Sequence, residues 1–418
     1  MNFKPNPLLY GANESFLSTF RLAIRMKSTV DYDLLSHAVE RTMVRYPYFC
    51  VCPEREGDEL VLRHNKQSLP VFPDDRTVTL GSSESHGHLI SFGCKDKTIF
   101  IDASHYLADG MGIDPLLKTL LYLYAAERYG TEGLAAERIR MPHDVVDEKE
   151  FSYPFPDKAT ETEDLSPPPP EHEAVYHLDP DAFDRDGLYA YHLHIPQKAM
   201  MAKANSSDGS PVSFLSVLFY RALQQLDHKI DKPVVAHVQH QYRASLQVPM
   251  SHHSLVSYIP VTFSPRLGSW DVEKQNTVVR GQIILKGGKE SDIAAINRLI
   301  TSFPCDASFA SKKEAMARYA ENSICGKTFG ISYVGKMDWC GLDRYVEDLH
   351  PYIGEKHTKS MLLIEVMTIG EDFTLTLMQS GRGDKYLNAF LKEIRAHDIP
   401  VKLAGEERYH ICNTRLPE

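Results

Sequence analysis

A proline-rich acidic segment divides this sequence into two parts that each mix strand and helix patterns. From Met141 to about Ala174 the chain contains the run DLSPPPPEHE and shows no helical or strand periodicity, which is typical of a linker. The chain of 418 residues is longer than one hydrophobic core usually serves. We therefore expect an α/β protein with an N-terminal lobe over 1–140, a proline-rich linker over 141–175 and a C-terminal lobe over 176–418.

The N-terminal part alternates strand and helix signals. Apolar residues alternate over 20–26, as in a half-buried strand. A helix is predicted to begin after Asp31, its N-cap, and to end at Pro47. Residues 48–64 have the pattern of a hairpin with its turn at 56–58.

The C-terminal part shows the same mixture and no short repeat. Pro211 is suited to the first turn of a strongly apolar helix. Strands are predicted over 187–195, 233–240, 256–263, 327–335, 360–369 and 372–380, and a last helix over 384–398. Each lobe should therefore hold a mostly mixed sheet flanked by helices.

Composition excludes several classes of protein. Apolar residues make up 43% and charged residues 24%, as in ordinary soluble enzymes. The net charge of -10 disfavours a nucleic-acid partner. The chain has no apolar run of the ~18 residues that a membrane span needs, and its start lacks the pattern of a signal peptide. Seven cysteines without a C-x-x-C pair indicate reduced thiols, so we expect a cytoplasmic protein. We also expect it to be a monomer.

The stretch SHYLADGMG, residues 104–112, carries the clearest chemical signal. It follows a strand predicted over 97–103 and precedes a helix predicted from Asp114 to about Tyr129. The stretch has two interpretations, a capped turn or a general base, His105, at the mouth of a cleft. The second is favoured because a neutral imidazole, with a pKa near ~6.5, accepts a proton at neutral pH. Gly110 and Gly112 are expected to let the backbone turn sharply after His105.

Other catalytic patterns are weak. Three histidine pairs lie close in sequence: His86 and His88, His237 and His240, and His252 and His253. No carboxylate or thiol completes a metal site with any of them, so we expect no metal. A zinc site stays as the disfavoured alternative. The run LKGGKES is not a phosphate-binding loop, and no G-x-S-x-G element is present.

The order of motifs resembles the chloramphenicol-acetyltransferase-like acyltransferases, which include alcohol acetyltransferases, polyketide-associated acyltransferases, plant BAHD enzymes and peptide-synthetase condensation domains. The resemblance is carried by VDYDLLSHAVERTMVRYPYF, SHYLADG, HVQHQYR, SLVSYIPV, FGISYVGKMD and EDFTLTLMQS. Only the H-x-x-x-D-G motif in SHYLADG is specific, and the other stretches carry weight through their order and spacing.

The resemblance implies two lobes meeting at a V-shaped cleft with a central tunnel. It implies that His105 is the general base, that Asp109 orients its loop by pairing with an arginine, and that Gly110 forms the turn. Arg243, at the end of HVQHQYR, is the candidate partner of Asp109. Ser332 is a candidate oxyanion contact.

Three positions depart from the family pattern. Ser104 stands where condensation domains have a second histidine, Cys50 lies near the place of their arginine, and Tyr333 replaces an asparagine. The first departure favours the alcohol-acyltransferase branches.

The predicted function is acyl transfer from a thioester of coenzyme A or an acyl carrier protein to a small alcohol or amine, without a covalent acyl-enzyme. No tightly bound cofactor is expected, since the thioester is a co-substrate. One alternative is a condensation-type enzyme joining carrier-bound substrates. Its docking surface would need basic residues, for which the candidates are Lys312, Lys313, Lys356 and Lys359. The other alternative is a non-catalytic relative that binds a thioester or a partner protein.

Overall fold

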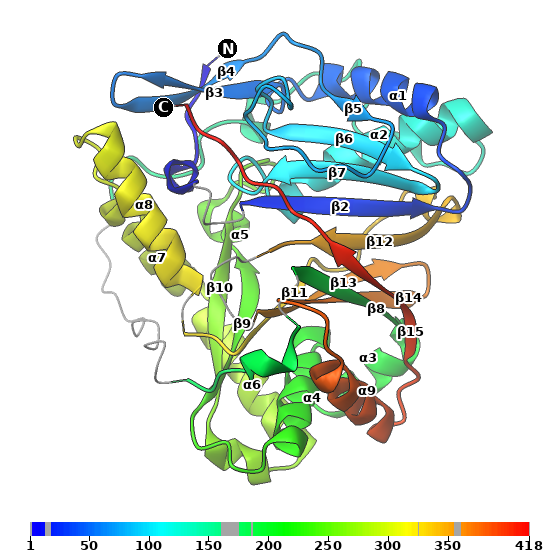
Figure 1. The fold of residues 1–418 in the computed structure, drawn as a ribbon, viewed down its shortest axis with the longest axis vertical. Helices are drawn as coiled ribbons and strands as arrows, with labels where there is room; N and C mark the ends of the chain where they lie inside the picture. Colours follow the sequence, from blue (N-terminus) through cyan, green and yellow to red (C-terminus); the bar gives the residue numbers. More distant parts are fainter. Residues whose placement is uncertain are drawn as a thin grey trace.

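The protein consists of two lobes, one above the other in Figure 1. The computed structural model describes residues 2–12, 18–159, 175–184, 187–324, 326–354 and 361–417. The proline run of the predicted linker lies outside the described residues, as do Cys325, Lys356 and Lys359. Among the described residues, no helix is both long and apolar enough to cross a membrane.

The N-terminal lobe is built on a five-stranded sheet with the order β12-β2-β7-β6-β5. Its strands are β2 (Thr19–Met26), β5 (Val71–Phe72), β6 (Ile90–Lys95), β7 (Thr98–Ser104) and β12 (Val346–Tyr352). A smaller sheet holds β1 (Asn2–Phe3), β3 (Val51–Glu56) and β4 (Glu59–His64). The predicted hairpin is therefore present, and Gly57 in its turn has a φ of 63°.

Two helices pack against each other in this lobe, α1 (Tyr32–Arg45) and α2 (Gly110–Tyr129). The carboxylate of Asp31 caps α1 as predicted, accepting from the N–H groups of Asp33 and Leu34. The prediction for the start of α2 was wrong by four residues, because Asp109 and not a later residue is its N-cap. Gly110 is thus the first residue of a helix and not part of a turn.

The C-terminal lobe is built on a seven-stranded sheet with the order β10-β9-β11-β13-β14-β8-β15. Its strands are β8 (Leu188–Pro196), β9 (Val234–Gln241), β10 (Val256–Phe263), β11 (Phe329–Tyr333), β13 (Leu362–Ile369), β14 (Asp372–Gln379) and β15 (Lys402–Tyr409). The two neighbours of β11 run parallel to it, and the other pairs are antiparallel. The mixed sheet that the sequence predicts is confirmed.

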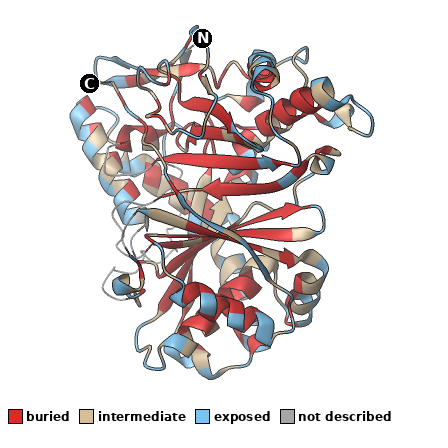
Figure 2. Ribbon diagram, turned by 45° about the vertical axis from the view of Figure 1, so that its right-hand side comes forward, coloured by how far each residue is buried: buried red, intermediate tan, exposed pale blue. Residues whose placement is uncertain are grey.

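Helices cover the face of this sheet that points away from the N-terminal lobe (Figure 1). They are α3 (Gln197–Ser206), α4 (Pro211–Leu226), α6 (Val272–Lys286) and α9 (Lys385–Ala396). The short α5 (Arg243–Leu246) follows β9, and α7 (Lys289–Ser302) and α8 (Phe309–Ile324) lie to one side. Figure 2 shows both large sheets almost wholly buried, whereas the helices keep exposed outer faces.

Sheet membership crosses the predicted lobe boundaries. β12, late in the sequence, is antiparallel to β2, with His350 opposite Ala23, so it lies in the upper lobe of Figure 1. The chain after β15 also returns to this lobe, where Thr414 bridges to Leu80. The sequence predicted neither β12 nor β15, because VEDLHPY and KLAGEERY carry charged residues within short apolar patterns. The boundaries at 140 and 175 remain a prediction from composition.

The described part of the predicted linker packs on the N-terminal lobe. A single 3₁₀ turn, Glu148–Glu150, places the buried side chain of Glu150 between Arg45 and Arg140. Arg45 binds it with both terminal nitrogens, and the hydroxyl of Tyr48 donates to it at 2.6 Å. Residues 141–159 are therefore anchored to the lobe despite their lack of periodicity.

Candidate active site

His105 follows the last residue of β7 and is held there by the backbone. Its N–H donates to the carbonyl of Ser18 at 2.7 Å, and Phe20 meets the imidazole edge-on with 5.3 Å between the ring centroids. Ser104, the preceding residue, points elsewhere, since its hydroxyl accepts from Thr414 at 2.9 Å. The end of β7 therefore presents the imidazole alone.

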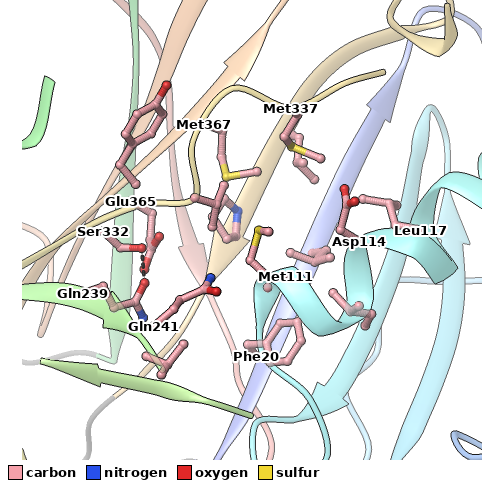
Figure 3. A pocket seen from close by; sticks show the side chains of 18 of the residues that line it. Phe20, Met111, Asp114, Leu117, Gln239, Gln241, Ser332, Met337, Glu365 and Met367 are labelled. Atoms are coloured by element: carbon pink, nitrogen blue, oxygen red, sulfur yellow. Dashed lines mark hydrogen bonds between the residues drawn. The ribbon is translucent and has the colours of Figure 1, made fainter. Parts of the chain in front are cut away.

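The imidazole faces a cavity of about 270 Å³ between the two lobes. One wall comes from β2 and α2 of the N-terminal lobe, together with β12. The other comes from β9, β11 and β13 of the seven-stranded sheet. Figure 3 shows Phe20, Asp114 and Leu117 on one side of it and Gln239, Ser332 and Glu365 on the other. A molecule bound in this cavity would touch both lobes and the histidine at once.

Burial favours the neutral form of His105. It lowers the pKa of the imidazole, and the charge of Asp109 and a hydrogen bond to the residue's own backbone oppose this only in part. Nδ1 lies 3.3 Å from the hydroxyl oxygen of Ser254. In the tautomer in which Nδ1 donates to Ser254, Nε2 is the nitrogen that accepts a proton, so the site can then supply a base at neutral pH.

Asp109 lies on the far side of the motif, paired with Arg243. The guanidinium donates to both carboxylate oxygens, at 2.7 Å and 2.8 Å, and Asp109 is fully buried. The same carboxylate accepts from the N–H groups of Gly112 and Leu255. All its lone-pair directions are used, so Asp109 fastens the start of α2 to the C-terminal lobe and is not free for substrate.

The glycines of the motif provide space rather than a turn. A Cβ on Gly112 would lie 2.0 Å from the backbone oxygen of His252, whereas one on Gly110 would meet only a methyl of Val334, at 3.4 Å. Neither glycine has a positive φ. The expectation of a sharp turn at these glycines was therefore wrong, since it is the close approach of α2 to His252 that requires Gly112.

Ser332, on β11, also lines the cavity. Its hydroxyl donates to the side-chain oxygen of Gln239 and is hydrogen-bonded to Glu365. Tyr333 lines the cavity as well. Cys50 does not, and burial raises the pKa of its thiol to about 11. Ser332 is thus near the reacting space, but its single proton already has a partner.

Several cavity residues were missed by the sequence analysis. Met111, Gln239, Gln241 and Glu365 project into the cavity from α2, β9 and β13 (Figure 3). One signal was available: Glu365 is the single charged residue in SMLLIEVMTI, a run that otherwise predicts a fully buried strand. The glutamines carried no such signal because polar residues are common near strand ends.

The histidine pairs have ordinary structural partners. His252 and His253 are hydrogen-bonded to the backbone oxygens of Glu150 and Phe151, and His237 stacks on Tyr258. Within the described part of the chain, no group of histidine, cysteine and acidic residues has the arrangement of a metal site.

The fold is shared with TRI101, with a polyketide synthase associated protein and with a condensation domain. No protein-family model and no curated protein sequence matches this chain. TRI101 from F. sporotrichioides, solved with coenzyme A and T-2, is 10% identical over 96% of this chain and 99% of its own, with a TM-score of 0.61. Polyketide synthase associated protein 5 from Mycobacterium tuberculosis is 13% identical over 90% of this chain and 92% of its own, with a TM-score of 0.57.

The condensation domain of the monacolin K polyketide synthase MokA is 10% identical over 95% of this chain and 96% of its own, with a TM-score of 0.52. These likenesses cover nearly whole chains, and they establish that the chain has the two-lobe chloramphenicol-acetyltransferase-like fold.

Proposed function

We propose that this chain is an acyltransferase that moves an acyl group from a thioester to an alcohol or amine, with His105 as its general base. The observation that carries the proposal is the place of His105, which faces a cavity between two lobes of this fold. The lowered pKa of the imidazole supports the role, because a base must be unprotonated to act.

In this mechanism, Nε2 of His105 takes the proton of the acceptor as the acceptor attacks the thioester carbonyl. The tetrahedral oxyanion then collapses, the C–S bond breaks, and His105 returns the proton to the departing thiolate. No acyl-enzyme is needed, since a cavity that holds both reactants supplies the proximity contribution. Asp109 and Arg243 act as positioning residues by fixing the loop that carries the imidazole.

A coenzyme A thioester is the donor to test first. TRI101 of F. sporotrichioides binds coenzyme A in its solved structure, and the fold is common to both chains. Docking of a carrier protein on the predicted basic residues is weakened, because Lys312 is buried and paired with Glu59. Lys313 lies near Phe309 on the same helix.

The test is thiol release by the His105→Ala variant with a panel of acyl-coenzyme A donors and small alcohols and amines. General bases contribute ~10²- to 10⁴-fold in rate, so we expect a loss of that size with an unchanged circular dichroism spectrum. Wild-type thiol release by the variant would refute the role of His105.

The absence of a covalent intermediate is tested separately. Initial rates should give intersecting plots when both substrates are varied, and intact mass spectra with donor alone should show the unmodified chain. Parallel plots with a stable acyl adduct would indicate a ping-pong route.

A further inference from the structure

Glu365 is a buried carboxyl group on the cavity wall that the proposed mechanism does not use. It lies on β13 with only 4% of its surface exposed and lines the cavity. No lysine, arginine or histidine among the described residues forms an ion pair with it. A carboxylate buried without a cation costs several kcal/mol, so this position carries a cost that a glutamine or methionine would avoid.

The neighbours of Glu365 in the sheet are polar but uncharged. Ser332 lies directly opposite it in the β11–β13 register and also donates to Gln239. Burial raises the pKa of Glu365 to about 7, although the hydrogen bond of Ser332 opposes this shift. The carboxyl group is therefore mostly protonated at about pH 6 and about half ionised at pH 7.

None of the other charged side chains that line the cavity forms an ion pair with Glu365. The further titratable side chains that line it are His105, Asp114, Lys118, His240, Lys336 and Asp338. Lys118 is paired with Asp114 at 2.7 Å, and Asp338 with Arg138. On the adjacent strand β14, Thr376 lies opposite Glu365 and carries no charge.

The surroundings of Glu365 in the cavity are mainly apolar. Met367 lies two residues further along β13, and Leu349 and Pro351 of β12 line the same space. Figure 3 shows Glu365 beside Ser332 and Gln239, with the methionines toward the rest of the pocket. A ligand that reaches Glu365 would therefore meet its carboxyl group in a cavity that also has apolar lining residues.

We propose that Glu365 binds a protonated amino group of the acceptor, so that the acceptor is an apolar molecule carrying an amine. This rests on the proposed function, because it assigns the acceptor side of the same cavity. An ammonium group supplies the positive charge that no described residue places beside Glu365, since Lys118 is paired with Asp114 and Lys336 is exposed. A hydroxyl group has no charge to offer the carboxylate.

The test measures equilibrium binding without any acyl donor, so that its outcome is separate from the question of acyl transfer. Phenethylamine and hexylamine are compared by calorimetry with their neutral counterparts 2-phenylethanol and hexanol. The wild-type protein should bind each amine about 10- to 100-fold more tightly than its alcohol, as expected for a buried charge-assisted hydrogen bond. In Glu365→Gln that preference should disappear.

A second variant and a proton count make the test specific. Glu365→Met keeps the side-chain volume and should also lose the preference, and both variants should fold because Glu365 has no ion pair to break. At about pH 6, amine binding to wild-type protein should release about one proton, since the acid ionises. Glu365→Gln should release none.

Equal affinity for amines and alcohols, an amine preference that survives in both variants, or no amine binding at millimolar concentration would overturn the proposal. Amine binding that depends on Glu365, without acyl transfer to any acceptor, would instead refute the proposed function and leave the amine site standing.

Discussion

At the scale of the residue, burial shifts the pKa of two ionisable groups of the cavity toward the neutral form. It lowers the pKa of His105 and raises the pKa of Glu365 to about 7. Desolvation penalises the charged form, which is the acid form of an imidazole and the base form of a carboxyl group. At neutral pH the cavity therefore offers an uncharged base and a carboxyl group that is about half protonated.

The first prediction concerns the pH dependence of acyl transfer. The base form of His105 persists to lower pH than that of an ordinary histidine because its pKa is lowered. We expect the acidic limb of the kcat/KM profile to be centred below ~6.5, the ordinary pKa of a histidine. A pH–rate profile of the wild-type protein, measured with an alcohol acceptor, checks this. An acidic limb centred above pH 6.5 would contradict the assignment.

The second prediction concerns the buried pair of Asp109 and Arg243. Asp109→Asn leaves the buried guanidinium without its counter-charge, and breaking one side of such a pair costs about 3–5 kcal/mol. We expect a loss of that order in the free energy of unfolding, measured with urea, together with a lower rate.

A double-mutant cycle with Arg243→Met separates the pair from its other contacts. Coupling is expected because the guanidinium binds both oxygens of Asp109. Additive effects of the two single changes would show that the pair contributes no interaction energy of its own.

At the scale of the element, the start of α2 is one place where the two lobes are joined by buried contacts. Asp109 caps the helix and binds Arg243, while Gly112 allows the backbone of His252 to approach. His252 is in turn hydrogen-bonded to Glu150 in the segment before the proline run. The helix therefore positions the loop that carries His105 through contacts to residues distant in sequence.

The third prediction compares the two glycines of the motif. Gly112→Ala should destabilise the protein by about 1–3 kcal/mol, the usual cost of overpacking, because its Cβ would lie 2.0 Å from a backbone oxygen. Gly110→Ala is the matched control, since its Cβ would meet one methyl at 3.4 Å. Urea unfolding of both variants checks the difference. Equal stability of the two variants would show that α2 can move away from His252 without cost.

At the scale of the whole molecule, β12 connects the two lobes. It is a strand of the N-terminal sheet, and its side chains form hydrogen bonds with strands of the seven-stranded sheet. Its strand partner is β2 in the N-terminal lobe. Its Asp348 binds His194 of β8 at 2.7 Å, and its Tyr352 donates to Glu407 of β15. Because one strand carries both sets of contacts, we expect the lobes to unfold in a single cooperative transition.

The fourth prediction uses the ionisation of that contact. Hydrogen bonds of His194 and His350 lower the pKa of Asp348. The contribution of this carboxylate to stability is therefore full above its unfolded pKa near ~3.9 and is lost as pH falls toward the folded pKa. Asp348 raises the pKa of His194, whose contribution is full below about pH 6.5 and is lost as pH rises through the folded pKa. Burial lowers the pKa of His350, so this histidine loses its charge at a lower pH than His194 does.

Asp348→Asn should therefore lower the free energy of unfolding most between about pH 4.5 and 6.5, by about 1–3 kcal/mol, and less above that range. Thermal unfolding of both proteins across pH 4.5 to 9 measures it. A cost that is constant or that grows with pH would exclude the charged pair as the source.

The local sequence determined most of the elements and indicated the proposed base. Alternating apolar residues, the cap of Asp31, Pro211 in the first turn of α4 and the glycine of the hairpin turn act within a few residues, so their effects can be predicted without knowing the rest of the chain. His105 stood out for the same reason, since its motif lies between a clear strand and a clear helix.

Only the tertiary structure decided which strands share a sheet and which polar groups share the cavity. β12 is stable in the N-terminal lobe because β2 offers it a free edge, which its own charged sequence does not reveal. Gly112 is needed because His252 approaches from 140 positions away along the chain. Glu365 faces His105's cavity because β13 lies beside β11. Such contacts depend on packing between distant segments, whereas local patterns report only what neighbouring residues do to one another.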